Sequence, residues 1–432
     1  MKNFANLFLF MILFVFSPSV MAQQLVCPTP LIQQITEDPV QSSQVSSMNG
    51  DATRISFSSF ANINGDNPEG NLELYLFDIP TDEFTAVTSN PVGNTGAQEI
   101  SESGNRIAFT SKANINNSNP DGNEEVYLQD IESGTTKQIT DTSGVNMNNE
   151  EAFISGNGER VAFQTNVISA NNPEGNYEIY VFDNPSDTLI MITDEPAGVA
   201  ARFPSLNGDG TLVAFSSNST NGGQNPEGNR ELFLANTVTN SVLQVTNTTS
   251  GDAFQSTITS DGSLVAFSHT GNVRGLNSTG NRQLFLFNLN TGDIGAVTND
   301  NTGDSFVPNI NGDGTCLAFH SNANLTGGNP LGGQQVYIYN IALDAFTQIT
   351  TDLDGVGVNG AVDNSCSLVT FTSNANINNG NPDNNFEVYL AQCVDPDDLR
   401  NVPTLSEWGL IAMASILGIV GFMVMRRRQV SA

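Results

Sequence analysis

The stretch GDNPEGNLELYLF at residues 65–77 joins a tight turn to a strand. In Asn-Pro-Glu-Gly-Asn, proline fixes φ at the first corner, glycine takes the left-handed conformation, and asparagine side chains can bond nearby backbone amides. The residues that follow alternate in steps of two, which indicates a strand. Six close copies occur later in the chain: SNPDGNEEVYL (118–128), NNPEGNYEIYV (171–181), QNPEGNRELFL (224–234), LNSTGNRQLFL (276–286), GNPLGGQQVYI (328–338) and GNPDNNFEVYL (380–390).

The spacing of the copies determines the architecture. A strand with a phenylalanine precedes each turn, and these phenylalanines are 52 residues apart, once 54: Phe57, Phe109, Phe163, Phe215, Phe267, Phe319 and Phe371. A polar segment before each phenylalanine strand and a segment ending in Thr after each of the first six copies bring the repeat to four strands. Solenoid coils repeat at about 20–30 residues and immunoglobulin-like domains need about 100. We therefore expect an all-β protein, a seven-bladed propeller with one four-stranded antiparallel blade per repeat.

The first and last repeats complement each other. After the seventh copy, whose strand covers residues 387–391, no fourth strand follows. Residues 31–36 (LIQQIT) have no preceding strands of their own and match AFTQIT at 345–350. Thr36 lies 52 residues before Thr88, in step with the later threonines. We therefore expect residues 31–36 to pair with 387–391, completing the last blade and closing the ring.

The cysteines fit this ring. Cys27 precedes the borrowed strand and Cys393 follows its expected neighbour, so both fall at the same end of the strand pair. We predict a Cys27–Cys393 disulfide, stabilising by about 5 kcal/mol at most because its loop is long. Cys316 and Cys366 lie near the start of the second strand in adjacent repeats, two residues out of register. A disulfide between two blades and a pair of buried thiols both remain open for them.

The repeat also resembles a known family. Within one unit, Asp-Gly at 209–210 leads to Val-Ala-Phe at 213–215, then to Glu-Leu-Phe-Leu at 231–234 and Gln-Val-Thr at 244–246. This order is similar to the WD40-like (PD40) repeats of TolB-type propellers, over nearly the whole mature chain. The resemblance implies the propeller fold and, by analogy, action through binding partners. It says little about the activity, because one fold hosts many.

Both chain ends have the composition of targeting segments. The beginning combines Lys2, the apolar run FLFMILFVF and the small-residue exit VMA, which is typical of a secretory signal peptide cut before Gln23. Near the other end, a helix over the 16 apolar residues 410–425 would span roughly 24 Å, short of the roughly 30 Å of a bilayer core. We expect a signal peptide at 1–22, a propeller at 23–395, a linker at 396–402, and a tail at 403–432 with a transmembrane helix at 410–425.

The tail resembles a sorting signal. It begins with a short motif and ends in a basic cluster: Pro403, Thr404, Leu405, Ser406, Glu407, Trp408 and Gly409, then Arg426, Arg427 and Arg428. Motif, apolar span and arginines in this order are similar to IPTL-type signals of Gram-negative bacteria, with Val402 where that family usually has Ile. The resemblance implies a transient stay in the inner membrane, cleavage by an exosortase-like transpeptidase, and delivery to the cell surface or the exterior. A plain single-span anchor is the alternative.

The charge balance excludes one class of partner. The chain has 14 Lys and Arg against 45 Asp and Glu, for a net charge of −31. This excess repels phosphate backbones, so we expect no nucleic-acid partner. Cations and basic surfaces remain compatible with it, and solubility alone would also account for the acidity.

Acidic side chains gather in and after the repeated turns. Carboxylate and amide oxygens two or three residues apart are hard ligands suited to Ca²⁺, although no copy has the spacing of an EF-hand. Turn chemistry alone also explains the repeat. We state calcium or ligand binding as a hypothesis for these residues: Asp66, Glu69, Glu73, Asp121, Glu124, Glu125, Glu174, Glu178, Glu227, Glu231, Asp383 and Glu387.

Catalysis is the weaker hypothesis. The chain lacks a G-x-S-x-G motif, and its two histidines, His269 and His320, follow phenylalanine at offsets of two and one, so strand alternation would point them to opposite faces. Glu150 and Glu151 are adjacent, which does not set the carboxylate separation of a glycosidase. We expect no catalytic residues and favour a surface-exposed, non-enzymatic binding or scaffold module for a protein or glycan. A calcium-binding structural protein and a propeller lyase or glycosidase are the alternatives.

Overall fold

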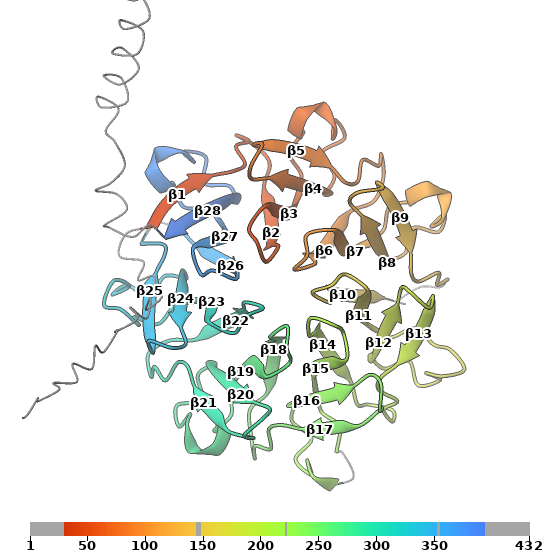
Figure 1. The fold of residues 1–432 in the computed structure, drawn as a ribbon, viewed down its shortest axis with the longest axis vertical. Coiled ribbons are helices and arrows are strands. Elements are labelled where there is room, and N and C mark those ends of the chain that lie inside the picture. The colour runs from red at the N-terminus through yellow and green to blue at the C-terminus, as the bar shows by residue number, and fades with distance from the viewer. Residues whose placement is uncertain (1–29, 144–147, 221–222, 352–354, 394–432) are drawn as a thin grey trace, which may run out of the picture.

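The computed structural model describes residues 30–143, 148–220, 223–351 and 355–393. They form seven four-stranded antiparallel sheets, arranged as blades around a central axis (Figure 1). The expected seven-bladed propeller is confirmed. Cys27, the predicted signal peptide, the linker and the tail lie outside the described residues. In the part that is described, no helix is long and apolar enough to cross a membrane.

Each blade runs outwards from the axis in chain order, except that β1 is the outer strand of blade 7. The innermost strands are β2 (Ser43–Met48), β6 (Thr95–Ile100), β10 (Asn149–Ile154), β14 (Ala201–Leu206), β18 (Ala253–Ile258), β22 (Ser305–Ile310) and β26 (Gly357–Val362). The second strands are β3 (Arg54–Ser59), β7 (Arg106–Ser111), β11 (Arg160–Thr165), β15 (Leu212–Ser217), β19 (Leu264–His269), β23 (Cys316–Ser321) and β27 (Leu368–Ser373). The third strands are β4 (Glu73–Asp78), β8 (Glu125–Asp130), β12 (Glu178–Asp183), β16 (Glu231–Asn236), β20 (Gln283–Asn288), β24 (Gln335–Asn340) and β28 (Glu387–Cys393). The outer strands are β5 (Glu83–Ala86), β9 (Thr135–Gln138), β13 (Thr188–Met191), β17 (Val242–Gln244), β21 (Ile294–Ala296), β25 (Ala345–Gln348) and β1 (Pro30–Gln34).

This order gives the disc two different faces. The turn face carries the hairpin turns between first and second strands and between third and fourth strands. The link face carries the loops between second and third strands and the links from one blade to the next. In the link-face loop of blade 1, Gly70 has a φ of 69°, and the Asn67 side chain donates to the carbonyl of Asn71 at 2.7 Å, as the turn chemistry predicts. Short 3-10 turns lie in four of these loops: η1 (Ile63–Gly65), η2 (Ile115–Asn117), η4 (Val273–Gly275) and η5 (Ile377–Asn379).

Stacked aromatic rings form the centre of every blade. The repeated phenylalanine of each second strand stacks on the aromatic residue of the third strand, with ring centroids 5.4–6.0 Å apart. Both rings are buried, and aliphatic residues of the preceding blade pack against them. The 52-residue period therefore reflects one packing arrangement used seven times.

The ring closes where the repeat analysis predicts. β1 pairs antiparallel with β28, with Ile32 opposite Ala391 and Gln34 opposite Tyr389. The pairing continues past the strand, since the Ile35 amide donates to the Val388 carbonyl at 2.8 Å. The last blade is thus completed by the beginning of the chain, as Figure 1 shows, and the ring has no open blade edge between its first and last repeats.

Disulfide bonds flank this closing blade. Cys316 at the start of β23 is bonded to Cys366 in the turn between β26 and β27, which settles the open alternative in favour of a link between blades 6 and 7. Cys393, the last residue of β28, is also disulfide-bonded. Its predicted partner, Cys27, lies outside the described residues, so that pairing stays a prediction.

Candidate functional site

Five of the twelve predicted cation ligands are not loop residues. They are the first residues of third strands, where they are buried at 0–1% exposure: Glu73, Glu125, Glu178, Glu231 and Glu387. In each, Oε1 accepts a backbone N–H from the link to the next blade at 2.6–3.1 Å. An asparagine two residues earlier donates to the same oxygen at 2.6–2.8 Å. The glutamates therefore fasten the links between blades, a role that the loop-based prediction missed.

The repeated threonines belong to the same network. Each lies two residues beyond the end of an outer strand, and its hydroxyl accepts the backbone N–H of the residue after the buried Glu or Gln at 2.8–3.0 Å. In blade 7, Thr36 takes this place and donates to Glu387. The threonine expected to end the fourth strand is therefore a link residue that ties the outer strand to the third strand.

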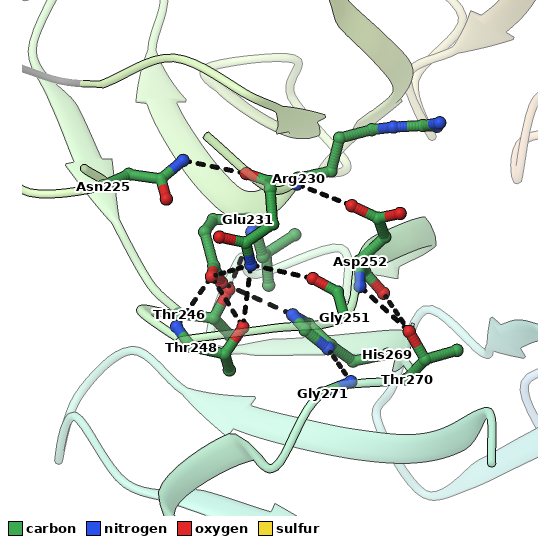
Figure 2. A network of polar contacts seen from close by, with 12 residues as sticks. Asn225, Arg230, Glu231, Thr246, Thr248, Gly251, Asp252, His269, Thr270 and Gly271 are labelled. Carbon is green, nitrogen blue, oxygen red and sulfur yellow. Dashed lines mark hydrogen bonds and ion pairs between the residues drawn. The ribbon is translucent and has the colours of Figure 1, made fainter. Parts of the chain in front are cut away.

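Blade 4 has a variant of this network, drawn in Figure 2. There Glu231 accepts from the backbone and hydroxyl of Thr248 at 2.6 and 2.7 Å, and its Oε2 lies 3.4 Å from Nε2 of His269 in blade 5. The other ring nitrogen, Nδ1, accepts the Gly271 N–H at 2.7 Å, which assigns the remaining ring proton of a neutral imidazole to Nε2. Both side chains are fully buried. In the other blades, a serine or threonine caps this turn instead, as Ser217 does for the Ser219 amide.

The pKa of the buried glutamate in blade 4 is shifted in the opposite direction to those in blades 1, 3 and 7. Burial raises the pKa of Glu73 and Glu387, and it raises the pKa of Glu178 to about 7. Burial acts in the same direction on Glu231, but hydrogen bonds from His269, Thr246 and Thr248 outweigh it and lower the pKa of Glu231 below its ordinary value. Glu231 is thus the member of the row whose charged form the fold stabilises most clearly.

The remaining predicted ligands lie apart from one another. Asp66, Glu69, Asp121, Glu174, Glu227 and Asp383 are exposed in separate link-face loops, and Glu124 is half-buried nearer the axis. Across the described ranges, no group of three or more His, Cys, Asp or Glu side chains is placed to hold a metal ion. Calcium binding by these loops remains a prediction. Calorimetric titration with Ca²⁺ tests this prediction. If Ca²⁺ produces neither heat nor a shift in melting temperature, the loops do not bind calcium.

At the turn face, the central channel is occupied. The second residues of the seven innermost turns surround the axis, and backbone hydrogen bonds connect neighbouring turns, such as Gly50 N–H to the Glu102 carbonyl at 2.9 Å. The Glu102 carboxylate crosses the axis, where it accepts from the Asn364 side chain at 2.7 Å and from the Ser260 hydroxyl. A Cβ at Gly156 would come within 2.6 Å of this carboxylate, so a larger residue there would displace the Glu102 side chain from its present position. The carboxylate therefore narrows the turn-face end of the channel, where a cavity of about 100 Å³ remains among these turns.

The turn-face arginines are structural. Arg54, Arg106 and Arg160 begin the second strands of blades 1 to 3 and pair with aspartates at the ends of the third strands, at 3.9, 3.3 and 2.8 Å. Each also donates to a backbone carbonyl of the next blade, at 2.6–3.0 Å. These guanidinium groups join neighbouring blades, so their role is structural.

The link-face end of the channel has a different lining. We use the name mouth cluster for seven half-buried or buried residues of blades 3 to 6: Tyr177, Arg202, Arg230, Phe254, Arg282, Phe306 and His320. The Arg202 guanidinium lies 3.8 Å from the Tyr177 ring centroid, and that of Arg282 lies 3.4 Å from the Phe254 centroid. The first pair joins blades 3 and 4, whereas Arg282 and Phe254 both belong to blade 5, and Arg282 also reaches Phe306 of blade 6 at 5.2 Å. The aromatic rings thus fix the arginines at the channel rim.

The charges around the mouth are divided between its two sides. In blades 2 and 3, Glu150 accepts from Tyr177 Oη at 3.0 Å, and burial, with Glu150 as the next cause, raises the pKa of Glu151. In blades 4 and 5, burial lowers the pKa of Arg282, the charge of Asp304 opposes this shift, and the charge of Arg230 adds to it. Deeper in the channel lies a cavity of about 160 Å³, where burial raises the pKa of Glu99 to about 7.

The histidines point to opposite sides of their sheets, as predicted. His269 contacts Glu231 of the preceding blade, whereas His320 accepts the Asn359 amide of the following blade at 3.4 Å and stacks on Phe306. Burial, with Arg282 nearby, lowers the pKa of His320 to about 4, so it is neutral at pH 7. Both residues are packing elements, and they do not form a pair.

Comparisons with known proteins support the fold and the tail. Residues 402–428 match the model described as IPTL-CTERM motif. No curated protein matches the sequence. Oligogalacturonate lyase from Vibrio parahaemolyticus is 13% identical with a TM-score of 0.59, covering 85% of this chain and 98% of that chain. The β-propeller domain of the Trilobed protease from Pyrococcus furiosus, which has an open velcro topology, is 12% identical with a TM-score of 0.54, covering 83% and 97%. TolB from Acinetobacter baumannii is 16% identical with a TM-score of 0.43, covering 71% and 78%. At such low identities, the likeness to the lyase and to the protease domain shows a shared propeller fold alone.

Proposed function

We propose that this IPTL-tailed propeller is a binding module displayed outside the cell, with the channel mouth on the link face as its recognition surface. The observation that carries the proposal is a contrast between two adjacent positions at the link face, one nearly the same in every blade and the other different in most blades. The residue that starts each third strand is Glu or Gln in all seven blades, whereas the residue just before it differs almost everywhere: Leu72, Glu124, Tyr177, Arg230, Arg282, Gln334 and Phe386. Structural needs do not explain that variation, but recognition of an asymmetric ligand does.

A blocking substitution tests this surface. Gly96 is the second residue of β6, at the rim position held by Arg202 and Phe254 in other blades, and a Cβ there has only Leu72 nearby, at 3.8 Å. Gly96→Trp should therefore fill the mouth without disturbing the fold. The control, Gly295→Trp, adds the same side chain on outer strand β21, where a Cβ meets nothing within 4 Å.

The readout is binding of the exported protein to a glycan and protein array. We expect specific ligands for the unmodified protein and for Gly295→Trp, and their loss in Gly96→Trp at unchanged melting temperature. Ligands that both variants retain would place recognition elsewhere on the disc. Ligands that appear as cleaved products in the same assay would instead make the mouth the site of a propeller lyase or glycosidase.

Display outside the cell has its own test. Deleting residues 403–409 removes the sorting motif and leaves the apolar span in place. We expect the deletion to leave the protein in the inner membrane fraction, because an exosortase-type transpeptidase would no longer process it. Unchanged release would contradict sorting by this tail.

A further inference from the structure

Resting on the proposed function, we infer that the mouth cluster recognises an acidic oligosaccharide, with Arg202, Arg230 and Arg282 binding sugar carboxylates. Planar guanidinium groups offer paired N–H donors that match a carboxylate. A uronate oligomer presents one carboxylate and several hydroxyl groups on each ring. The mouth cluster and its surroundings offer hydrogen-bonding partners for the carboxylate and for the hydroxyl groups.

The first argument is that the guanidinium donors of these arginines are not used within the described part of the protein, although the carboxylates of Asp304 and Glu151 act on Arg282 and Arg202 from a distance. Among the described residues, none of the three forms an ion pair or donates a guanidinium hydrogen bond, although acidic residues outnumber basic ones three to one in the chain. The turn-face arginines all pair with aspartate, which shows that the fold supplies partners where an arginine is structural. The donors at the mouth are therefore free for an anion.

The second argument is that the arginines are held in place before any ligand arrives. Arg282 lies 3.4 Å from the Phe254 centroid and 5.2 Å from that of Phe306, and Arg230 lies 5.9 Å from the Phe254 centroid. His320 stacks behind Phe306 at 5.2 Å and, being neutral at pH 7, adds no charge of its own. Stacking on rings orients the guanidinium groups while leaving their edges available to a ligand.

The third argument selects a sugar over an acidic peptide. The Gln255 side-chain oxygen, on the innermost strand of blade 5, has no hydrogen-bond partner among the described residues. In the register of β18 and β19, Phe254 and Gln255 bulge opposite Ser268, and Gln255 takes the position at which Glu151 and Asn359 line the cavity in other blades. An unsatisfied buried oxygen favours a ligand rich in hydroxyl donors.

Charge limits the size of the ligand. The basic half of the mouth spans blades 4 and 5, while Glu124, Glu150 and Glu151 occupy the adjacent blades 2 and 3, and the chain has a net charge of −31. A long polyanion would meet this repulsion on every side. A short oligomer that fits between the arginines avoids it.

The experiment uses calorimetric titration of the exported protein with oligogalacturonate, a neutral oligosaccharide of the same length, and oligoglutamate. The variants are Arg282→Gln and Arg230→Gln. The control is Arg274→Gln, which removes the same charge from an exposed residue of the same blade that has no ion pair. We expect oligogalacturonate to bind in preference to the other two, with weaker binding at high salt. Each mouth variant should weaken binding about tenfold or more, a loss expected of a charge-assisted pair, and Arg274→Gln should not.

Three outcomes overturn the inference. They are no binding of oligogalacturonate, equal binding of the neutral sugar, and preference for oligoglutamate, which would make the partner an acidic peptide. Melting temperatures of the variants exclude loss of folding as the cause. The proposed function is tested separately. If Gly96→Trp still binds the array ligands, the mouth is not the recognition surface. If Gly96→Trp loses these ligands but Arg230→Gln and Arg282→Gln still bind them, only the acidic sugar is ruled out.

Discussion

Adjacent residues at the link face have opposite tasks, and Arg230 and Glu231 show this best. In Figure 2, Glu231 points into a dense set of hydrogen bonds while the side chain of Arg230 extends away from it. Glu231 is fully buried and bonded to the link and to the next blade, whereas the Arg230 guanidinium has one ring nearby, at 5.9 Å. The row of buried Glu and Gln residues that start the third strands connects the blades. The residues just before them, which we call the mouth row, differ from blade to blade.

This difference shows how a repeat protein can acquire a site. The geometry of a blade needs the same side chain in the buried row seven times, and Glu or Gln supplies it. The mouth row has no such constraint, so residues that break the repeat are the ones most informative about recognition. The predictions below separate the two rows, from the largest expected effect to the smallest.

Removing the carboxylate of Glu231 should lower the free energy of unfolding more than any of the other substitutions below. Glu231→Ala leaves His269 buried without its partner and the Thr248 amide without its acceptor. We expect the free energy of unfolding to fall by roughly 3–5 kcal/mol, as measured by urea denaturation. Glu227→Ala, in the exposed part of the same loop, should change it by less than about 0.5 kcal/mol. Equal effects of the two substitutions would contradict a structural role of the buried row.

Replacing His269 should lower the free energy of unfolding by a smaller amount, and the size of this loss should depend on pH. In His269→Ser, the serine can cap the Gly271 amide as serines do in other blades, so the losses are the bond to Glu231 and the packing of the buried ring. We expect a loss of about 1.5–3 kcal/mol near pH 7. Because the folded-state pKa of Glu231 is lowered, its contribution is present above the ordinary pKa and is lost as pH falls through the folded value. The unfolding curves of the two proteins should therefore converge in acid, and a constant difference would refute this explanation.

The fold could be predicted because its signals are local and repeated. The 52-residue period of phenylalanines gave the number of blades, and Thr36, in step with Thr88, identified the strand that closes the ring. The role of the buried row was also within reach. Glu73 and Thr88 are 15 residues apart, and the same separation recurs for Glu125 and Thr140. Such a constant distance indicates a contact, which the structure shows between the side chains in blades 1 to 4 and 6.

The mouth cluster could not be derived in the same way. Arg282 lies in the fifth copy, but its aromatic partner Phe306 belongs to the next blade, and their contact depends on how blades pack at the axis. A bulge in the innermost strand of all seven blades also shifts the register there, and sequence alternation does not reveal it. The available signal was the departure of Arg230 and Arg282 from the acidic trend of the chain.

A change in the buried row of blade 3 should show the reverse pH dependence. The folded-state pKa of Glu178 is raised to about 7, so its contribution to stability is present below the ordinary pKa and is lost as pH rises through the folded value. Glu178→Gln keeps the hydrogen-bonding shape that Gln283 and Gln335 provide in other blades. Relative to the unmodified protein, it should gain on the order of 1 kcal/mol between about pH 4.5 and 7. Glu174→Gln, which is exposed, should show no such gain in thermal unfolding across this range.

The smallest effect on stability is expected in the mouth row. Arg230→Gln introduces the residue type found at this position in blade 6, Gln334, and removes one guanidinium 5.9 Å from a ring centroid. Because a half-exposed contact of this kind contributes little, we expect the free energy of unfolding to change by less than about 0.5–1 kcal/mol. Binding of an acidic sugar should nevertheless weaken about tenfold in the same variant. A substitution that lowered stability and binding together would mean that Arg230 belongs to the structural row after all, and the division between the two rows would have to be drawn elsewhere.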